Sequence, residues 1–142
     1  MMTLKERILA KINQPTLSAL ATITEDGKPW VRYVTPMADK NLTLWMATSI
    51  TTRKVAQIRK NPEVHLTVGV TTMETAESYL QIQGRAEILT DEKTKKAVWF
   101  EQLKAVFSGS DDPNYTVCKI TPYRIEYQKM VPGVPPEVWE SK

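Results

Sequence analysis

An Asp-Gly turn between two β-rich runs constrains the fold of this chain more than any other feature. The runs span residues 17–23 and 30–35, and Glu25-Asp26-Gly27-Lys28 joins them. An Asp-Gly pair between two such runs is a strong signal for a β-hairpin. Strands joined by so short a turn pair antiparallel. The sequence therefore predicts an antiparallel hairpin near the N-terminal end of the chain.

The rest of the chain is also dominated by strands. Four further β-rich runs are predicted, over residues 42–47, 64–70, 79–89 and 115–130. Helices are predicted over residues 3–12, 51–60 and 91–107, the first capped by Thr3 with Glu6 in capping-box register. Three helices are too few for a doubly wound parallel sheet. The pattern predicts a mainly β fold, a small closed or partly split antiparallel β-barrel with flanking helices.

Composition favours an ordinary folded protein. The chain has 142 residues, of which 42% are hydrophobic and 25% charged, so a single domain over 1–142 is expected. Residues 131–142, rich in proline, should form an extended tail with Trp139 as an anchor. The chain has one cysteine, which rules out an intrachain disulfide. With one cysteine and one histidine, the ligands of a metal site would have to be nearly all carboxylates, so we expect no metal site. We expect a cytoplasmic protein with no membrane segment.

The charge balance suits a small anionic ligand as well as it suits nucleic acid. The net charge is +3, but 16 acidic residues are dispersed among 19 basic ones. Nucleic-acid binding needs a concentrated basic face. The sole candidate for such a face is one short predicted helix with four basic residues, Arg53, Lys54, Arg59 and Lys60. No nucleic-acid partner is therefore expected.

A run of hydroxyl residues leads into the basic helix. Arg53 and Lys54 fall in its first turn, where the helix dipole disfavours cations unless an anion is bound. The preceding hydroxyl residues could add donors to a phosphate pocket; they are Thr48, Ser49, Thr51 and Thr52. The alternative is that Ser49 or Thr51 caps the helix while both cations point into water.

Arg32 is a second candidate for the same anion. Strand alternation places it on one face with Trp30 and Val34, and it would reach the anion if the hairpin packs beside the third β run. The alternative is an exposed arginine on a half-solvated strand.

Other polar residues are weaker candidates. Cys118 has no neighbouring base and is expected to be a packed strand cysteine. His65 alternates out of phase with Val64 and Leu66, which favours the polar face of a strand over a ligand role. Residues 111–112 lack calcium-loop spacing and are expected to be solvated turn carboxylates.

Several segments together carry a family resemblance: Leu20-Ala21-Thr22-Ile23, Asp26-Gly27-Lys28-Pro29, Arg32-Tyr33-Val34-Thr35-Pro36-Met37, residues 48–54 and Gly84-Arg85-Ala86-Glu87. In their order and spacing the chain resembles the pyridoxamine 5′-phosphate oxidase-like, FMN-binding split-barrel clan, and most closely its bacterial general stress protein branch. The resemblance implies an antiparallel split β-barrel and a homodimer with flavin at the subunit interface.

The resemblance also implies site residues. The family strand that matches residues 32–37 lies along the flavin, and its arginine helps to bind the phosphate. A residue pair before the helix matches Ala47 and Thr48, and the Arg-Lys pair that holds the FMN phosphate matches Arg53 and Lys54. With the neighbouring hydroxyl residues and a glutamine, the expected FMN-binding set is Arg32, Tyr33, Val34, Thr35, Ala47, Thr48, Ser49, Thr52, Arg53, Lys54 and Gln81.

The chain departs from the family pattern at several positions. Met37 stands where the family has a lysine, and Gln128 where it has a flavin-side tryptophan. The family glutamine falls at Tyr79, with Gln81 on the same face two residues later. The oxidase's C-terminal Arg-x-His signature has no counterpart, so the resemblance does not imply oxidation of pyridoxamine phosphate.

Two functions are consistent with this resemblance. The first is a homodimeric FMN-dependent oxidoreductase, reductase or oxidase, that acts on an unidentified small substrate, with a stress-related role left open; no catalytic residue is assigned. The second is a protein that binds or sequesters flavin without turnover. Use of the deazaflavin F420 stays open, whereas a single histidine disfavours haem.

Overall fold

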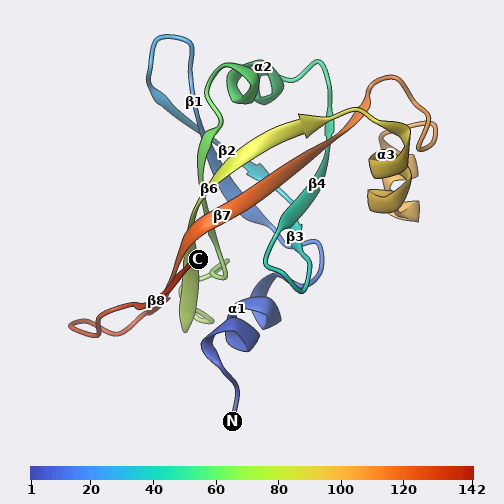
Figure 1. Ribbon diagram of the computed structural model, residues 1–142. Coiled ribbons are helices and arrows are strands. Elements are labelled where there is room, and N and C mark those ends of the chain that lie inside the picture. Colours follow the sequence, from blue (N-terminus) through green and yellow to red (C-terminus); the bar gives the residue numbers. More distant parts are fainter.

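A computed structural model describes all 142 residues, and eight strands form one antiparallel sheet with helices around it (Figure 1). The strands are β1 (Ser18–Ile23), β2 (Pro29–Val34), β3 (Met37–Ala38), β4 (Leu44–Ser49), β5 (Glu63–Val68), β6 (Ser78–Leu89), β7 (Tyr115–Lys129) and β8 (Glu137–Glu140). The helices are α1 (Leu4–Ile12), α2 (Arg53–Lys60), α3 (Glu92–Val98) and a 3₁₀ turn, η1 (Glu101–Ala105). No helix has the length and apolar character that a membrane span requires.

The sheet is a split barrel. Its strand order is β2-β1-β5-β6-β7-β4-β3, with β8 added to β7. β2 pairs with β1 alone, and β4 beyond Trp45 pairs with β7 alone, so one edge of β2 and one edge of β4 remain unpaired. The predicted mainly β, antiparallel split-barrel fold is confirmed, in its open rather than its closed form.

The core fills the inside of the curved sheet. Alternate residues of β1, β4 and β5 are buried, as expected for strands with one face on a core. Seventeen buried side chains form the main cluster, which includes Ile8 and Ile12 of α1 and Ile58 of α2. These two helices lie toward opposite ends of the sheet (Figure 1). The predicted Thr3–Glu6 capping box begins α1 and is confirmed.

The single helix predicted over residues 91–107 is wrong. α3 ends at Val98, Trp99 and Phe100 are extended, and η1 follows. Trp99 and Phe107 both pack on the ring of Tyr115, with centroids 5.3 and 5.2 Å away. Eight residues of continuous helix would separate them by about 12 Å along the axis. The chain therefore leaves the helix so that both aromatic side chains reach the same ring.

The strand predicted over residues 42–47, which is β4 in the structure, also differs from its prediction. It begins at Leu44 rather than residue 42, because Leu42 has a left-handed φ of 66° in a turn. The Asp39 carboxylate accepts hydrogen bonds from the backbone N–H groups of Asn41 and Thr43, at 2.8 and 3.1 Å, and so stabilises that turn. The short strand β3, paired with the start of β4, was not predicted.

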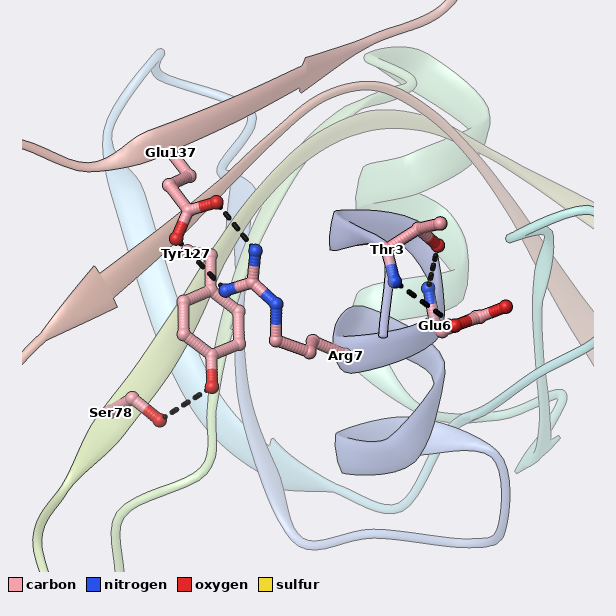
Figure 2. A network of polar contacts seen from close by, with 6 residues as sticks. All are labelled: Thr3, Glu6, Arg7, Ser78, Tyr127 and Glu137. Carbon is pink, nitrogen blue, oxygen red and sulfur yellow. Dashed lines mark hydrogen bonds and ion pairs between the residues drawn. The ribbon is translucent and has the colours of Figure 1, made fainter. Parts of the chain in front are cut away.

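The C-terminal tail is extended as predicted, but it also pairs with the sheet as β8. Trp139 lies opposite Ile125 of β7 and packs against the main core of its own chain. Figure 2 shows Glu137 of β8 accepting a hydrogen bond of 2.9 Å from Arg7 of α1, whose guanidinium stacks 5.0 Å above the ring of Tyr127. These contacts join the two ends of the chain.

Candidate functional site

Three cationic side chains meet where α2 begins, next to the open edge of β2. Arg32 lies in β2 opposite the fully buried Leu20, so its side chain starts on the inner face of the sheet. Its guanidinium donates to the Thr22 hydroxyl at 2.7 Å and to the Gln57 side-chain carbonyl at 3.0 Å. Arg32 is therefore a half-buried residue fixed between β1 and α2, and not an exposed arginine on a half-solvated strand.

The start of α2 lacks the features that usually satisfy a helix N-terminus. Thr52 is the N-cap, but its hydroxyl makes no capping bond and donates to the Ser49 carbonyl at 2.9 Å. The hydroxyls of Ser49 and Thr51 lie 3.1 Å from each other, so the alternative that one of them caps the helix is wrong. The first turn contains no acidic residue. Backbone N–H groups at this end thus remain available to an anion.

The first turn of α2 contributes the other two cations. Lys54 donates to the Thr52 hydroxyl at 3.3 Å, and that hydroxyl lies 3.5 Å from the buried Thr48 hydroxyl. The guanidinium of Arg53 stacks over Trp30 of β2, 5.4 Å from the ring centroid.

The three cations have no anionic partner. None of the chain's ion pairs includes Arg32, Arg53 or Lys54. Burial, and then the charge of Arg53, lower the pKa of Arg32. Burial, and then the charge of Arg32, lower the pKa of Lys54. A bound anion would stabilise all three charged forms, so the geometry suits a small dianion such as a phosphate group.

The other expected site residues lie around this cluster or apart from it. Val34 points inward, Tyr33 points outward, Thr35 follows β2 directly, and Ala47 lies half-buried in β4. Gln81 lies on the outer face of β6. Three strand-to-strand steps separate Gln81 from Tyr33, because the register pairs Tyr33 with Ala19, Ala19 with Thr67, and Thr67 with Gln81. At the usual spacing between strands, these steps put about 14 Å of sheet between Tyr33 and Gln81. Within one chain the structure therefore groups the phosphate-site residues and leaves Gln81 apart.

Three residues that the sequence pattern did not assign to the site complete the cluster: Thr22, Trp30 and Gln57. Two of them carried a signal, since Trp30 shares a strand face with Arg32 and Gln57 lies one helical turn after Arg53. Thr22 could be found only from the pairing of β1 with β2, which sets it opposite Trp30.

The remaining candidates stand as packed or surface residues. Cys118 is buried, and burial raises the pKa of its thiol to about 12, which argues against a thiolate nucleophile. His65 is half-buried on the outer face of β5; burial lowers its pKa, and the charge of Glu126 opposes that shift. Asp112 accepts hydrogen bonds from the N–H groups of Ser108 and Asn114 in its loop. No three His, Cys, Asp or Glu side chains gather as a metal ion would require.

A large cavity adjoins the end of β2. Its volume is about 1060 Å³, and its wall includes Thr35, Met37, Trp45 and the segment from α3 to η1. Residues 32–37 connect the two sites: Arg32 at the start of this segment belongs to the cationic cluster, and Thr35 and Met37 at its end line the cavity.

Comparison with known proteins assigns the chain to a class. The family model described as pyridoxamine 5′-phosphate oxidase matches residues 4–129, and the chain belongs to this family. Within it, the chain is similar to general stress protein 26 of Bacillus subtilis, with 33% identity over 119 residues that cover 84% of each chain. The resemblance found in the sequence is thereby confirmed.

Two solved structures support the same assignment. General stress protein 26 from Bacillus anthracis superimposes with a TM-score of 0.81 at 30% identity, over 99% of this chain and 100% of that one. A putative pyridoxamine 5′-phosphate oxidase from Listeria innocua gives a TM-score of 0.75 at 30% identity, over 90% of this chain and 98% of that one.

Proposed function

We propose that this protein binds FMN and that Arg32, Arg53 and Lys54 hold its phosphate. The observation that carries the proposal is the group of three cations without a carboxylate partner, placed at an uncapped helix N-terminus. Membership of the pyridoxamine 5′-phosphate oxidase family supports the general class of flavin-binding or oxidoreductase proteins.

The open edge of β2 suits the polar ring of a flavin. The backbone N–H and C=O groups on that edge have no partner strand, so they are free to hydrogen-bond a ligand. Thr35, which directly follows β2, has a small side chain that leaves room for a flat ring. FMN, when bound, supplies the redox chemistry, while these residues would fix its phosphate and orient its ring.

The substrate differs from that of the oxidase that gives the family its name. Met37 replaces a lysine, Gln128 replaces a tryptophan, and the Arg-x-His signature is absent. We therefore propose an FMN-dependent oxidoreductase, reductase or oxidase, that acts on another small molecule.

The proposal includes a homodimer with the flavin between subunits. Tyr33, Val31 and Leu17 are 76%, 62% and 52% exposed on or beside the outer face of the sheet, which is unusual for large apolar side chains of a monomer. Gln81 points from the same face. A second copy that covers this face would bring its own Gln81 toward the site. The interface should exceed roughly 2,000 Å² in total, as obligate dimers usually do.

Titration with FMN tests the proposal. Purified protein should bind FMN at one molecule per chain, and the chromophore released on denaturation should have the spectrum of FMN rather than of F420 or haem. Analytical ultracentrifugation at micromolar concentration with FMN present should show a dimer. Absence of FMN binding would contradict the cofactor assignment, and a monomer under these conditions would contradict the dimer.

A flavin-sequestering protein without turnover is the second candidate, favoured by the departures at Met37 and Gln128. The two functions differ in whether the protein accelerates redox chemistry. An oxidoreductase should let NADH or NADPH reduce its FMN, and let an added acceptor reoxidise it, faster than free FMN reacts. Rates equal to those of free FMN would favour sequestration.

A further inference from the structure

The cavity of about 1060 Å³ beside β4 and α3 is open to solvent on one side and lined largely by aromatic and apolar side chains. Three aromatic side chains stand in its wall, Trp45 from β4 and Trp99 with Phe100 from the segment after α3. Pro15, Met37, Ala97 and Val98 add further apolar surface. Sites for small organic molecules are typically this size or somewhat smaller and are lined in this way.

The two tryptophan rings are held in place by contacts outside the cavity. The Trp45 indole N–H donates to the Asp39 carboxylate at 3.0 Å, and the Lys119 ammonium lies 5.5 Å from the same ring. Trp99 packs edge-on against Tyr115 with centroids 5.3 Å apart. Rings fixed beforehand lose little conformational freedom when a flat ligand stacks on them.

The charges around the cavity disfavour a phosphate group. Lys93 is the one charged residue of the wall. The nearby N-terminus of α3 is already occupied, because the Asp91 carboxylate accepts from the backbone N–H of Thr94 at 3.0 Å and from its hydroxyl at 2.8 Å. These bonds lower the pKa of Asp91 and keep it ionised, while Glu92 in the same turn is paired with Lys96 at 2.7 Å. A dianion would therefore find one cation in the wall, Lys93, beside a helix N-terminus that the Asp91 carboxylate already occupies.

We propose that this cavity binds a neutral, fused-ring aromatic molecule without a phosphate group, as the substrate of the flavin site. The inference rests on the proposed function, because Thr35 and Met37 of the wall directly follow the strand proposed to hold the flavin. Met37 of the wall has an apolar side chain, which offers no charge to an anionic substrate.

A matched pair of probes tests the inference. 2-Naphthol and 2-naphthyl phosphate share a ring system and differ in the phosphate. Calorimetric titration of the FMN-loaded protein, in which the cationic cluster is occupied, should show one 2-naphthol bound per chain. 2-Naphthyl phosphate should bind at least about tenfold more weakly, a difference of about 1.4 kcal/mol. Equal or tighter binding of the phosphate ester, or no binding of naphthol, would overturn the inference.

A cavity-filling variant locates the binding site. Ala97 is exposed on α3 and lines the cavity, so Ala97→Trp should fill it and weaken 2-naphthol binding at least about tenfold. Ala105→Trp adds the same ring on an exposed residue of η1 outside the wall and should leave binding unchanged. FMN affinity and the dimer should be unchanged in both variants.

Three results have separate meanings. If Ala97→Trp abolishes FMN binding, the cavity is the flavin slot itself and the inference is wrong. If it splits the dimer, the cavity belongs to the subunit interface and the inference is again wrong. If the unaltered protein binds no FMN, the proposed function fails, and naphthol titration of the free protein still decides whether the aromatic cavity binds its ligand class.

Discussion

Replacement of Arg53 tests the phosphate site most cleanly, because this residue is exposed and its side chain makes no hydrogen bond within the chain. Arg32, by contrast, holds Thr22 and Gln57, so its loss would disturb the fold as well as the site. The Arg53 guanidinium stacks over Trp30, 5.4 Å from the ring centroid. We expect Arg53→Ala to weaken FMN binding while the protein without ligand keeps its stability.

The magnitudes follow from the contacts. A hydrogen bond to a charged phosphate contributes about 1.5–3 kcal/mol, so FMN affinity should fall roughly 10- to 150-fold. Loss of the stacking on Trp30 costs about 0.5–1 kcal/mol. Removal of a cation from the first turn of α2 returns about 0.3–1 kcal/mol. These two effects oppose each other, so the free energy of unfolding without ligand should change by no more than about 0.7 kcal/mol in either direction.

Titration of FMN and riboflavin against both proteins provides the measurement, with urea unfolding of the free proteins beside it. Riboflavin lacks the phosphate and should bind Arg53→Ala as it binds the unaltered protein. Arg59→Ala removes an exposed arginine from the last turn of the same helix and serves as the matched control, with FMN affinity unchanged. Equal losses for both ligands, or no loss for FMN, would refute the assignment.

Further substitutions test the charge, the tail and the sheet. Lys54→Met should weaken FMN binding and stabilise the free protein by about 0.3–1 kcal/mol. Burial lowers the pKa of Lys54 in the folded protein, so the folded state loses this proton at a lower pH than the unfolded chain, whose lysine has the ordinary pKa of 10.5. The unaltered protein therefore becomes more stable as pH rises toward 10.5, and the advantage of Lys54→Met should shrink over that range. Urea unfolding at a series of pH values measures the advantage and its pH dependence. Trp139→Ala should lower the free energy of unfolding by about 2 kcal/mol, since this half-buried ring packs on the core; an unchanged midpoint would contradict its anchoring role. Gly84→Ala should cost about 1–3 kcal/mol, because its Cβ would lie 2.9 Å from the Thr121 carbonyl oxygen; thermal unfolding measures it.

Local patterns determined much of the fold. The Asp-Gly hairpin, the alternation in β5 and the capping box at Thr3 each depend on residues close together in the chain, and the structure contains all three. The predictions that failed depended on distant partners. The helix after Asp91 breaks because Trp99 and Phe107 both reach Tyr115, and β8 forms because β7 offers it an edge.

The candidate site divides in the same way. The sequence by itself determined that Arg53 and Lys54 begin a helix after a run of hydroxyl residues, because helix start signals are local. Only the tertiary structure decided that Arg32 joins them, since the register of β1 with β2 sets its face and Gln57 of α2 receives its hydrogen bond. Only the tertiary structure left the three cations without a carboxylate partner, because charges far apart in the sequence become neighbours, or stay apart, through the folding of the sheet.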